Sequence, residues 1–122
     1  MIRRCARCKI QVSREIAPLP DASLISTEDG SDYLPTGFYT IGDEFFHSAQ
    51  GHYILNMQDV INLRDHPDSS RFSGCCQLDG LNGVNKVCEN GHEIGTECSD
   101  CWMPHSIHMS PEAVEESVAI AI

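Results

Sequence analysis

The sequence predicts an α+β fold made mainly of short antiparallel strands, a small zinc-stapled domain similar to a zinc ribbon, with a C-terminal helix. The chain has 122 residues, which suits one domain with a moderate core, so we expect residues 1–122 to form a single metal-binding domain. Its aromatic content is only 7% but it has seven cysteines, and metal cross-links would compensate for a core poor in large side chains. Most segments with clear local patterns are strand-like, apart from a short helical segment in the middle and the last one.

The composition is acidic, and this excludes some partners. Eighteen Asp and Glu residues against eight Lys and Arg give a formal net charge of −10, so we expect no nucleic-acid partner. The N-terminal residues lack the apolar core of a secretory signal, and no apolar run is long enough to cross a membrane. We therefore expect a cytoplasmic protein, where clustered cysteines more often bind metal or do redox work than form structural disulfides.

The N-terminal segment has the pattern of a metal-binding hairpin. Cys5 and Cys8 form a CxxC motif that leads directly into residues 9–16, where alternating apolar side chains predict a strand. This is the layout of a zinc knuckle at a hairpin tip. The basic residues around the motif favour a solvated rim over an anion-binding patch, because thiolates attract positive charge. They are Arg3, Arg4, Arg7 and Lys9.

The middle of the chain predicts a loop, two strands and a short helix. Residues 17–36 contain several prolines and acidic side chains and predict a long loop. Residues 37–46 are rich in aromatic and β-branched side chains and predict a strand, with residues 52–55 as its partner. Asn56 suits the N-cap of a short helix over residues 57–63.

Two local patterns mark the second half. Asn90-Gly91 lies between two strand-like segments within residues 84–96, which favours a hairpin with a two-residue type I′ turn. The same turn could equally shape a C-x3-H metal knuckle. Ser110, Pro111 and Glu112 then resemble an N-cap, a first helical position and a first-turn acid, so we expect a C-terminal helix over residues 111–119.

Two CxxC motifs supply the first predicted ligand set, Cys5 and Cys8 with Cys98 and Cys101. Structural zinc takes four Cys or His ligands in a tetrahedron, often as two short-spaced pairs that folding brings together. One or both pairs could instead be free core thiols, but the spacing favours metal.

A second ligand set lies between these motifs. Cys75 and Cys76, with Cys88 and His92 in a C-x3-H arrangement, could form a Cys3His site. A disulfide between the adjacent Cys75 and Cys76 would need a strained ring, and in an extended segment their side chains point to opposite sides. Seven thiolates and one imidazole would fill two sites, although one site with spare structural cysteines explains the same residues.

The stretch from Gly74 to His105 carries a distinctive pattern. It contains GCC-x-x-DG-x-x-G-x-N-x-x-C over residues 74–88, a glycine-bearing turn at 90–91, and T-E-x-S-D-C-W-x-P-H over residues 96–105. Together with the N-terminal CxxC, this pattern resembles a family of uncharacterised small bacterial proteins. The resemblance implies a bacterial source and no particular function. Because the pattern does not include Cys98, it leaves Cys88, Cys75 or Cys76 as alternative partners for Cys5 and Cys8.

The main functional hypothesis is a zinc-binding protein with one or two structural ions that binds a protein partner or a ligand, because thiolate-closed zinc provides shape without reactivity. One alternative is a thiol-based redox or metal-sensing protein in which Cys75 and Cys76 react. Another is a small hydrolase, dependent on metal or on a Cys/His pair, that uses His92 or His105. His105 could also replace His92 as a ligand. The sequence decides neither enzymatic activity nor oligomeric state.

Overall fold

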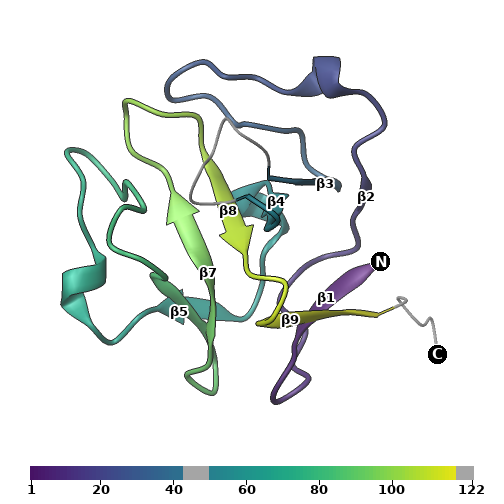
Figure 1. Ribbon diagram of the computed structural model, residues 1–122, viewed down its shortest axis with the longest axis vertical. Helices are drawn as coiled ribbons and strands as arrows, with labels where there is room; N and C mark the ends of the chain where they lie inside the picture. The colour runs from purple at the N-terminus through teal and green to yellow at the C-terminus, as the bar shows by residue number, and fades with distance from the viewer. Residues whose placement is uncertain (43–49, 118–122) are drawn as a thin grey trace.

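The computed structural model describes residues 1–42 and 50–117, and in these residues the protein is built mainly from short strands (Figure 1). The strands are β1 (Ile2–Cys5), β2 (Ala17–Pro18), β3 (Phe38–Ile41), β4 (Tyr53–Leu55), β5 (Leu63–Asp65), β6 (Lys86–Cys88), β7 (Glu93–Cys98), β8 (Ser106–Met109) and β9 (Val114–Ser117). One sheet has the order β2-β3-β4-β8-β7-β6-β5, and β1 with β9 forms a separate two-stranded sheet. Neighbouring strands pair antiparallel, except that β2 pairs with β3 in parallel.

The predicted α+β class is wrong, because the described part of the chain contains no long helix. Its helical segments are the short 3-10 turns η1 (Ala22–Leu24), η3 (Met57–Asp59) and η4 (Ser69–Arg71). None of the helices in the described ranges has the length and apolar character needed to cross a bilayer. The architecture is therefore a mainly β one.

The predicted C-terminal helix over residues 111–119 is wrong over its described part, which is a turn followed by β9. Ala113 N donates to Ser110 O (3.0 Å) and closes the turn. Serine and proline suit the first two positions of a type I turn as well as they suit a helix start. The start of the predicted helix, Ser110-Pro111-Glu112, therefore suits a turn as well as a helix. Residues 118 and 119 lie outside the described residues.

Pairing with β1 explains why this segment extends instead of coiling. The register places Arg3 opposite Glu116 and Arg4 opposite Glu115, and it buries Val114. Cross-strand pairs of opposite charge stabilise antiparallel strands, and such tertiary contacts outweigh local helix propensity.

The middle of the chain follows the predicted strand order but lacks the predicted helix. β3 and β4 pair antiparallel, while residues 43–46 of the predicted strand lie outside the described residues. Asn56 caps a helical turn by accepting from Gln58 N (2.8 Å), as predicted, but that turn is only η3. The chain leaves the helical path at Val60, whose φ of −100° and ψ of 144° are extended. Asn62 then has a left-handed φ of 57°, and β5 begins directly after it.

The main core cluster takes side chains from both sheets and from the segment that follows the CxxC motif. Its buried members are Cys5, Val12, Ile16, Leu55, Cys88, Ile94, Ile107, Met109 and Val114. Ile54 points to the other face of the large sheet and packs with Tyr33 and Leu34 in a smaller cluster. Two cysteines thus belong to the main core, which places any ion that they hold beside it.

The chain reverses direction at the CxxC motif. β1 ends at Cys5, and Lys9 has a φ of 66°, a left-handed conformation that interrupts the extended backbone. Residues 9–16 then contact β1 through the isolated bridge Arg4↔Gln11 and form no regular strand. The motif therefore occupies the tip of a hairpin-like reversal.

Arg3 is a buried element of the fold, although the sequence favoured a solvated rim. Its side chain is 1% exposed and forms an ion pair with Glu116 (2.9 Å). Its guanidinium carbon lies 4.7 Å from the ring centroid of Tyr39 and 3.9 Å from that of Tyr53. Arg3 thus joins the β1–β9 sheet to β3 and β4 by stacking and by charge.

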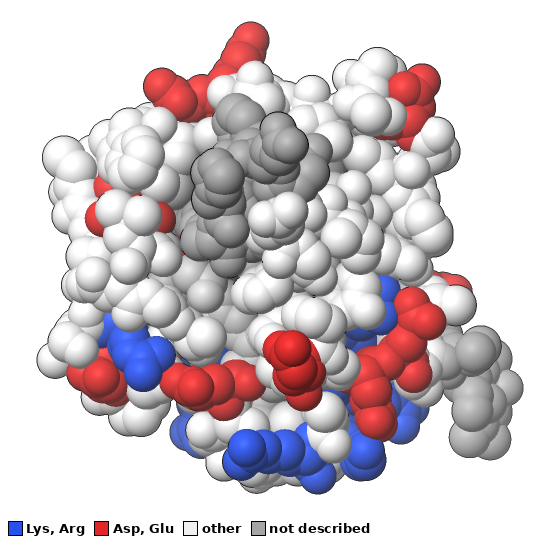
Figure 2. All heavy atoms as spheres, in the orientation of Figure 1, with Lys and Arg blue, Asp and Glu red and all other residues white. Residues whose placement is uncertain are grey.

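Charged side chains on the surface also form ion pairs between neighbouring segments. In the view of Figure 2, Lys and Arg side chains lie in the lower part of the molecule and alternate there with Asp and Glu. Lys9 pairs with Glu115 (2.9 Å) at the edge of the two-stranded sheet, and Lys86 pairs with Asp65 (2.6 Å) across β6 and β5. Much of the small basic complement is therefore neutralised by neighbouring strands.

Arg3→Lys tests the stacking. Lysine keeps the charge but lacks the planar guanidinium that lies against two tyrosine rings. We expect the free energy of unfolding, measured by urea denaturation, to fall by about 1–3 kcal/mol. Arg14→Lys, at an exposed position, is the matched control and should change it by less than about 0.5 kcal/mol. Equal, small effects in both variants would contradict the stacking role.

Candidate metal centres

The first candidate centre is formed where two hairpin tips meet at the same end of the molecule (Figure 1). One tip is the CxxC turn, in which Lys9 N donates to Cys5 O (2.9 Å). This tight reversal brings the sulfur atoms of Cys5 and Cys8 to the same side. The other tip joins β6 to β7 and carries Cys88 and His92.

The β6–β7 turn differs from the predicted type I′ hairpin in a way that shapes this centre. Cys88 N donates to His92 O (2.9 Å), and Gly91 N donates to Cys88 O (2.9 Å), so the loop has three residues instead of two. Gly91 has a positive φ of 82°, while Asn90 is not among the residues with positive φ. This matches a type I turn followed by a left-handed glycine. Cys88 and His92 therefore face each other across the hairpin base.

Four donor atoms converge between the two tips, and we call Cys5, Cys8, Cys88 and His92 the inner cluster. All four atoms lie within 4.8 Å of one another. His92 Nδ1 is 3.5 Å from Cys5 Sγ and 3.5 Å from Cys88 Sγ, and Cys8 Sγ is 3.8 Å from Cys88 Sγ. A tetrahedral zinc site with Zn–S of about 2.3 Å and Zn–N of about 2.0 Å has S···S edges of about 3.8 Å and S···N edges of about 3.5 Å. The inner cluster could hold a metal ion with these edges.

The surroundings of the inner cluster favour the thiolate form of Cys8. The Asn90 side chain and the backbone N–H of Ile10 donate to its sulfur and lower the pKa of this thiol to about 6. Burial raises the pKa of Cys5, while the backbone N–H groups of Cys8 and Arg7 donate to its sulfur and oppose that effect. The turn therefore supplies donors that stabilise negative sulfur on both cysteines.

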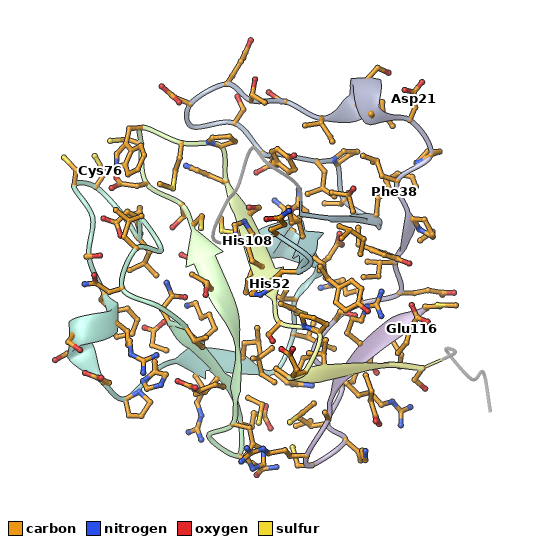
Figure 3. All side chains as sticks on the ribbon, viewed as in Figure 1. Asp21, Phe38, His52, Cys76, His108 and Glu116 are labelled. Atoms are coloured by element: carbon orange, nitrogen blue, oxygen red, sulfur yellow. The ribbon has the colours of Figure 1, made fainter. Side chains whose placement is uncertain are left out.

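A second group of thiols lies far from the hairpin tips, and we call Cys75, Cys76 and Cys101 the outer cluster. Their sulfur atoms lie within 4.8 Å of one another and all three residues are exposed. Cys76 Sγ is 2.8 Å from Cys101 Sγ. Figure 3 shows Cys76 at the outer edge of the molecule, on the opposite side from Glu116 of β9. The outer cluster could also hold a metal ion.

One buried carboxylate holds the outer cluster together. Asp100 has no exposed surface, and its carboxylate accepts from the backbone N–H groups of Cys75 (2.8 Å), Cys76 (2.9 Å) and Cys101 (2.8 Å). It also accepts from Trp102 Nε1 (2.9 Å). These donors, with that of Cys76 foremost, hold the pKa of the Asp100 carboxyl well below its usual range. Asp100 thus fixes the backbone of every residue in the cluster.

The thiols of the outer cluster affect one another's ionisation. The hydrogen bond and charge of Cys76 raise the pKa of Cys75, and its hydrogen bond is also the main reason that the pKa of Cys101 is raised to about 12. Several thiolates so close together repel one another, and a cation would relieve that repulsion.

The structure groups the predicted ligands differently from the sequence-based pairs. Cys5 and Cys8 lie with Cys88, one of the alternative partners that the resemblance left open, and with His92. Cys101 lies with Cys75 and Cys76. Cys98 belongs to neither group. It is buried, and burial raises the pKa of its thiol to about 12. That each grouped residue binds metal stays a prediction.

Two further side chains were not singled out as site residues by the sequence. Asp100 accepts from the backbone of all three outer cysteines, and Asn90, which the sequence marks only as a turn residue, donates to the sulfur of Cys8. His105, the alternative ligand, lies outside both groups in the described residues, and its Nε2 is 3.0 Å from Asp100 O. It therefore supports the turn that carries Cys101.

Gly74→Ala tests the packing of the outer loop. Gly74 has a φ of 148°, and a Cβ there would overlap the backbone oxygen of Gln77 and lie 2.9 Å from Asp100 Oδ2. Gly83→Ala is the matched control, because Gly83 also has a positive φ (90°) but its nearest contact would be an ordinary 3.6 Å to Arg71.

We expect Gly83→Ala to lower the free energy of unfolding by roughly 1–2 kcal/mol, from the backbone conformation alone, and Gly74→Ala to lower it further. Only Gly74→Ala should also shift the emission of Trp102, the single tryptophan, because Trp102 shares Asp100 with the loop. Equal stabilities and spectra for the two variants would contradict this account of the loop.

No protein-family model, no curated protein and no solved structure matches the chain. The chemistry of the two clusters is therefore the basis for inferring a function.

Proposed function

We propose that the protein is a zinc-binding protein whose inner cluster, Cys5, Cys8, Cys88 and His92, binds one structural Zn²⁺ ion. The observation that carries this proposal is the set of donor separations, 3.5, 3.5 and 3.8 Å, which are the edge lengths of a tetrahedral zinc site. Two hairpin tips about eighty positions apart in the chain would have no reason to present three sulfurs and one imidazole nitrogen at these separations by packing alone.

The donor set favours zinc over other common ions. Thiolate and imidazole are poor ligands for Mg²⁺ and Ca²⁺, which take oxygen donors. Cys3His is a recurrent set for structural zinc, which has no preference of its own beyond four ligands in a tetrahedron.

The same donors support a structural role. Four protein ligands leave no coordination position for water or substrate, which a catalytic zinc requires. Cys5 and Cys88 belong to the main core, so the ion would join the end of β1 to the β6–β7 hairpin and tie the two sheets together. Because the ligands assemble only on folding, the free energy of metal binding would contribute directly to stability.

A closed ion of this kind gives the domain shape rather than reactivity, so we propose that its role is to bind a protein partner or a ligand. Trp102, at 50% exposure, supports this, because aromatic side chains are enriched at protein interfaces relative to the rest of the surface. The hydrolase alternative has no support at His92, whose Nδ1 faces the sulfurs of the inner cluster.

Elemental analysis tests the zinc proposal. We expect a Cys76→Ser/Cys101→Ser variant, which lacks two of the three thiols of the outer cluster, to contain one zinc ion per chain when purified without added metal. Replacement of that zinc by Co²⁺ should give the visible absorption of a tetrahedral ion with thiolate ligands. Absence of bound metal in this variant, with a normal cooperative melt, would sink the proposal.

Single substitutions identify the ligands. Cys5→Ser and Cys88→Ser should each abolish zinc binding and the cooperative thermal transition, because the binding free energy is part of the folding free energy. Cys98→Ala is the matched control, since Cys98 is buried like Cys5 and Cys88 but lies outside the cluster. It should retain zinc and a cooperative melt, with a loss of about 1–2 kcal/mol from the truncated side chain.

A further inference from the structure

The outer cluster differs from the inner cluster in the two properties that decide how a metal site behaves. In the described residues it gathers three donors, and Cys75, Cys76 and Cys101 are all exposed. The inner cluster has four donors, two of them buried. A tetrahedral ion held by three protein ligands keeps one coordination position for a ligand from outside, and an exposed site lets that ligand reach the metal.

The fold also fixes the backbone of the outer cluster. Asp100, which has no exposed surface, accepts N–H groups from all three cysteines of the cluster. Gly74 provides the backbone conformation that lets the loop approach Asp100, because any side chain there would overlap Gln77. Ser99, the residue before Asp100, also contacts the loop, because its Oγ accepts from Leu78 N (3.4 Å). A loop fixed in this way loses little conformational entropy when its thiols bind an ion.

Further contacts lock the loop base to the sheet. The buried Asn85 side chain accepts from Glu97 N (2.7 Å) and donates to Glu97 O (3.1 Å). Asp79 Oδ1 accepts from Ser73 Oγ (2.6 Å) and from Leu81 N (3.0 Å). The thiols therefore stand on a rigid support although they face solvent.

We propose that the outer cluster is a second metal site, which binds one soft cation of the class Zn²⁺, Cd²⁺ or Cu⁺ through three thiolates and exchanges it through an open fourth position. Thiolates select soft cations over Mg²⁺ and Ca²⁺. The open position takes water or an exogenous thiolate, and this gives chelators and competing thiols a route to the ion that the four-ligand inner cluster does not offer.

Cadmium titration tests this site in the full chain. Protein with zinc in the inner cluster is kept in a non-chelating reductant and titrated with Cd²⁺, while sulfur-to-cadmium charge-transfer absorption and elemental composition are recorded. We expect one bound Cd²⁺ per chain with the zinc retained, and rapid removal of that Cd²⁺ by a chelator that leaves the zinc in place. Cadmium that binds only by releasing zinc, or no cadmium binding, would overturn the proposal.

Variants assign the cadmium to the outer cluster. Cys76→Ser and Cys101→Ser remove one exposed ligand each and should weaken Cd²⁺ binding by about 100-fold or more, without a change in zinc content. Asp100→Asn should weaken it by about 10–100-fold by disturbing the positions of the ligands. Asp21→Asn, at an exposed cap that asparagine can equally form, is the matched control and should bind like the unmodified protein.

Cys76 Sγ and Cys101 Sγ are 2.8 Å apart, which is shorter than the S···S edge of about 3.8 Å in a tetrahedral zinc site. The two side chains must therefore move apart to bind an ion, and a disulfide between them is the main competing outcome. Two thiols would then lose two electrons and two protons to an oxidant and become unreactive toward metal. A protein that gains two free thiols when it is treated with excess reductant contains this disulfide, and failure of the reduced protein to bind cadmium would contradict the metal site. Zinc content is measured on the same samples, so failure of the outer site is distinguished from failure of the inner one.

Discussion

The convergence of the CxxC turn with the β6–β7 hairpin is the constraint on which the rest of the structure depends. β1 belongs to the two-stranded sheet, whereas β6 lies in the larger sheet between β7 and the edge strand β5. Cys5 and Cys88 bring the two strands together inside the main core. Unbound thiolates are costly in such a place, because burial disfavours charge. A core that is poor in large side chains can nevertheless hold them if a cation neutralises them there, and the ion then replaces contacts that aliphatic packing would otherwise supply.

Arg3 provides a second contact between the two sheets. Instead of facing solvent, its guanidinium lies between Tyr39, Tyr53 and Glu116. A planar cation can stack on rings and pair with a carboxylate at once, which a lysine cannot do to the same degree. The β1–β9 sheet is therefore attached to the larger sheet at one end by Arg3 and, in our proposal, at the other end by the inner zinc.

The sequence predicted local features, such as a cap or a turn, better than it predicted the helix or strand that contains them. Asn56 caps a helical turn and Gly91 ends a hairpin loop, because these depend on a few neighbouring residues. The segment from Ser110 was expected to be helical, since its Ser-Pro-Glu start suits a helix and a turn equally, and only the distant partner β1 decides between them. The ligand grouping failed to follow from spacing for the same reason: Cys98 and Cys101 form a CxxC motif, yet Cys98 points into the fold and Cys101 faces solvent. Asp100 bonds residues more than twenty positions away, and no periodicity marks such a carboxylate.

The two clusters use the same side-chain chemistry under opposite conditions of solvation, and this argues for different roles. In our proposal the inner thiolates need a cation in order to be buried, so the fold would keep that ion bound permanently. The outer thiols are in water, where an empty cluster can simply take up protons, and the hydrogen bonds that shape it end at Asp100 and do not depend on a metal. Loss of an outer ion would therefore leave the loop in place, while loss of the inner ion would expose the core. This difference between the two clusters depends on Asp100, because it holds the outer cysteines in position whether or not an ion is bound.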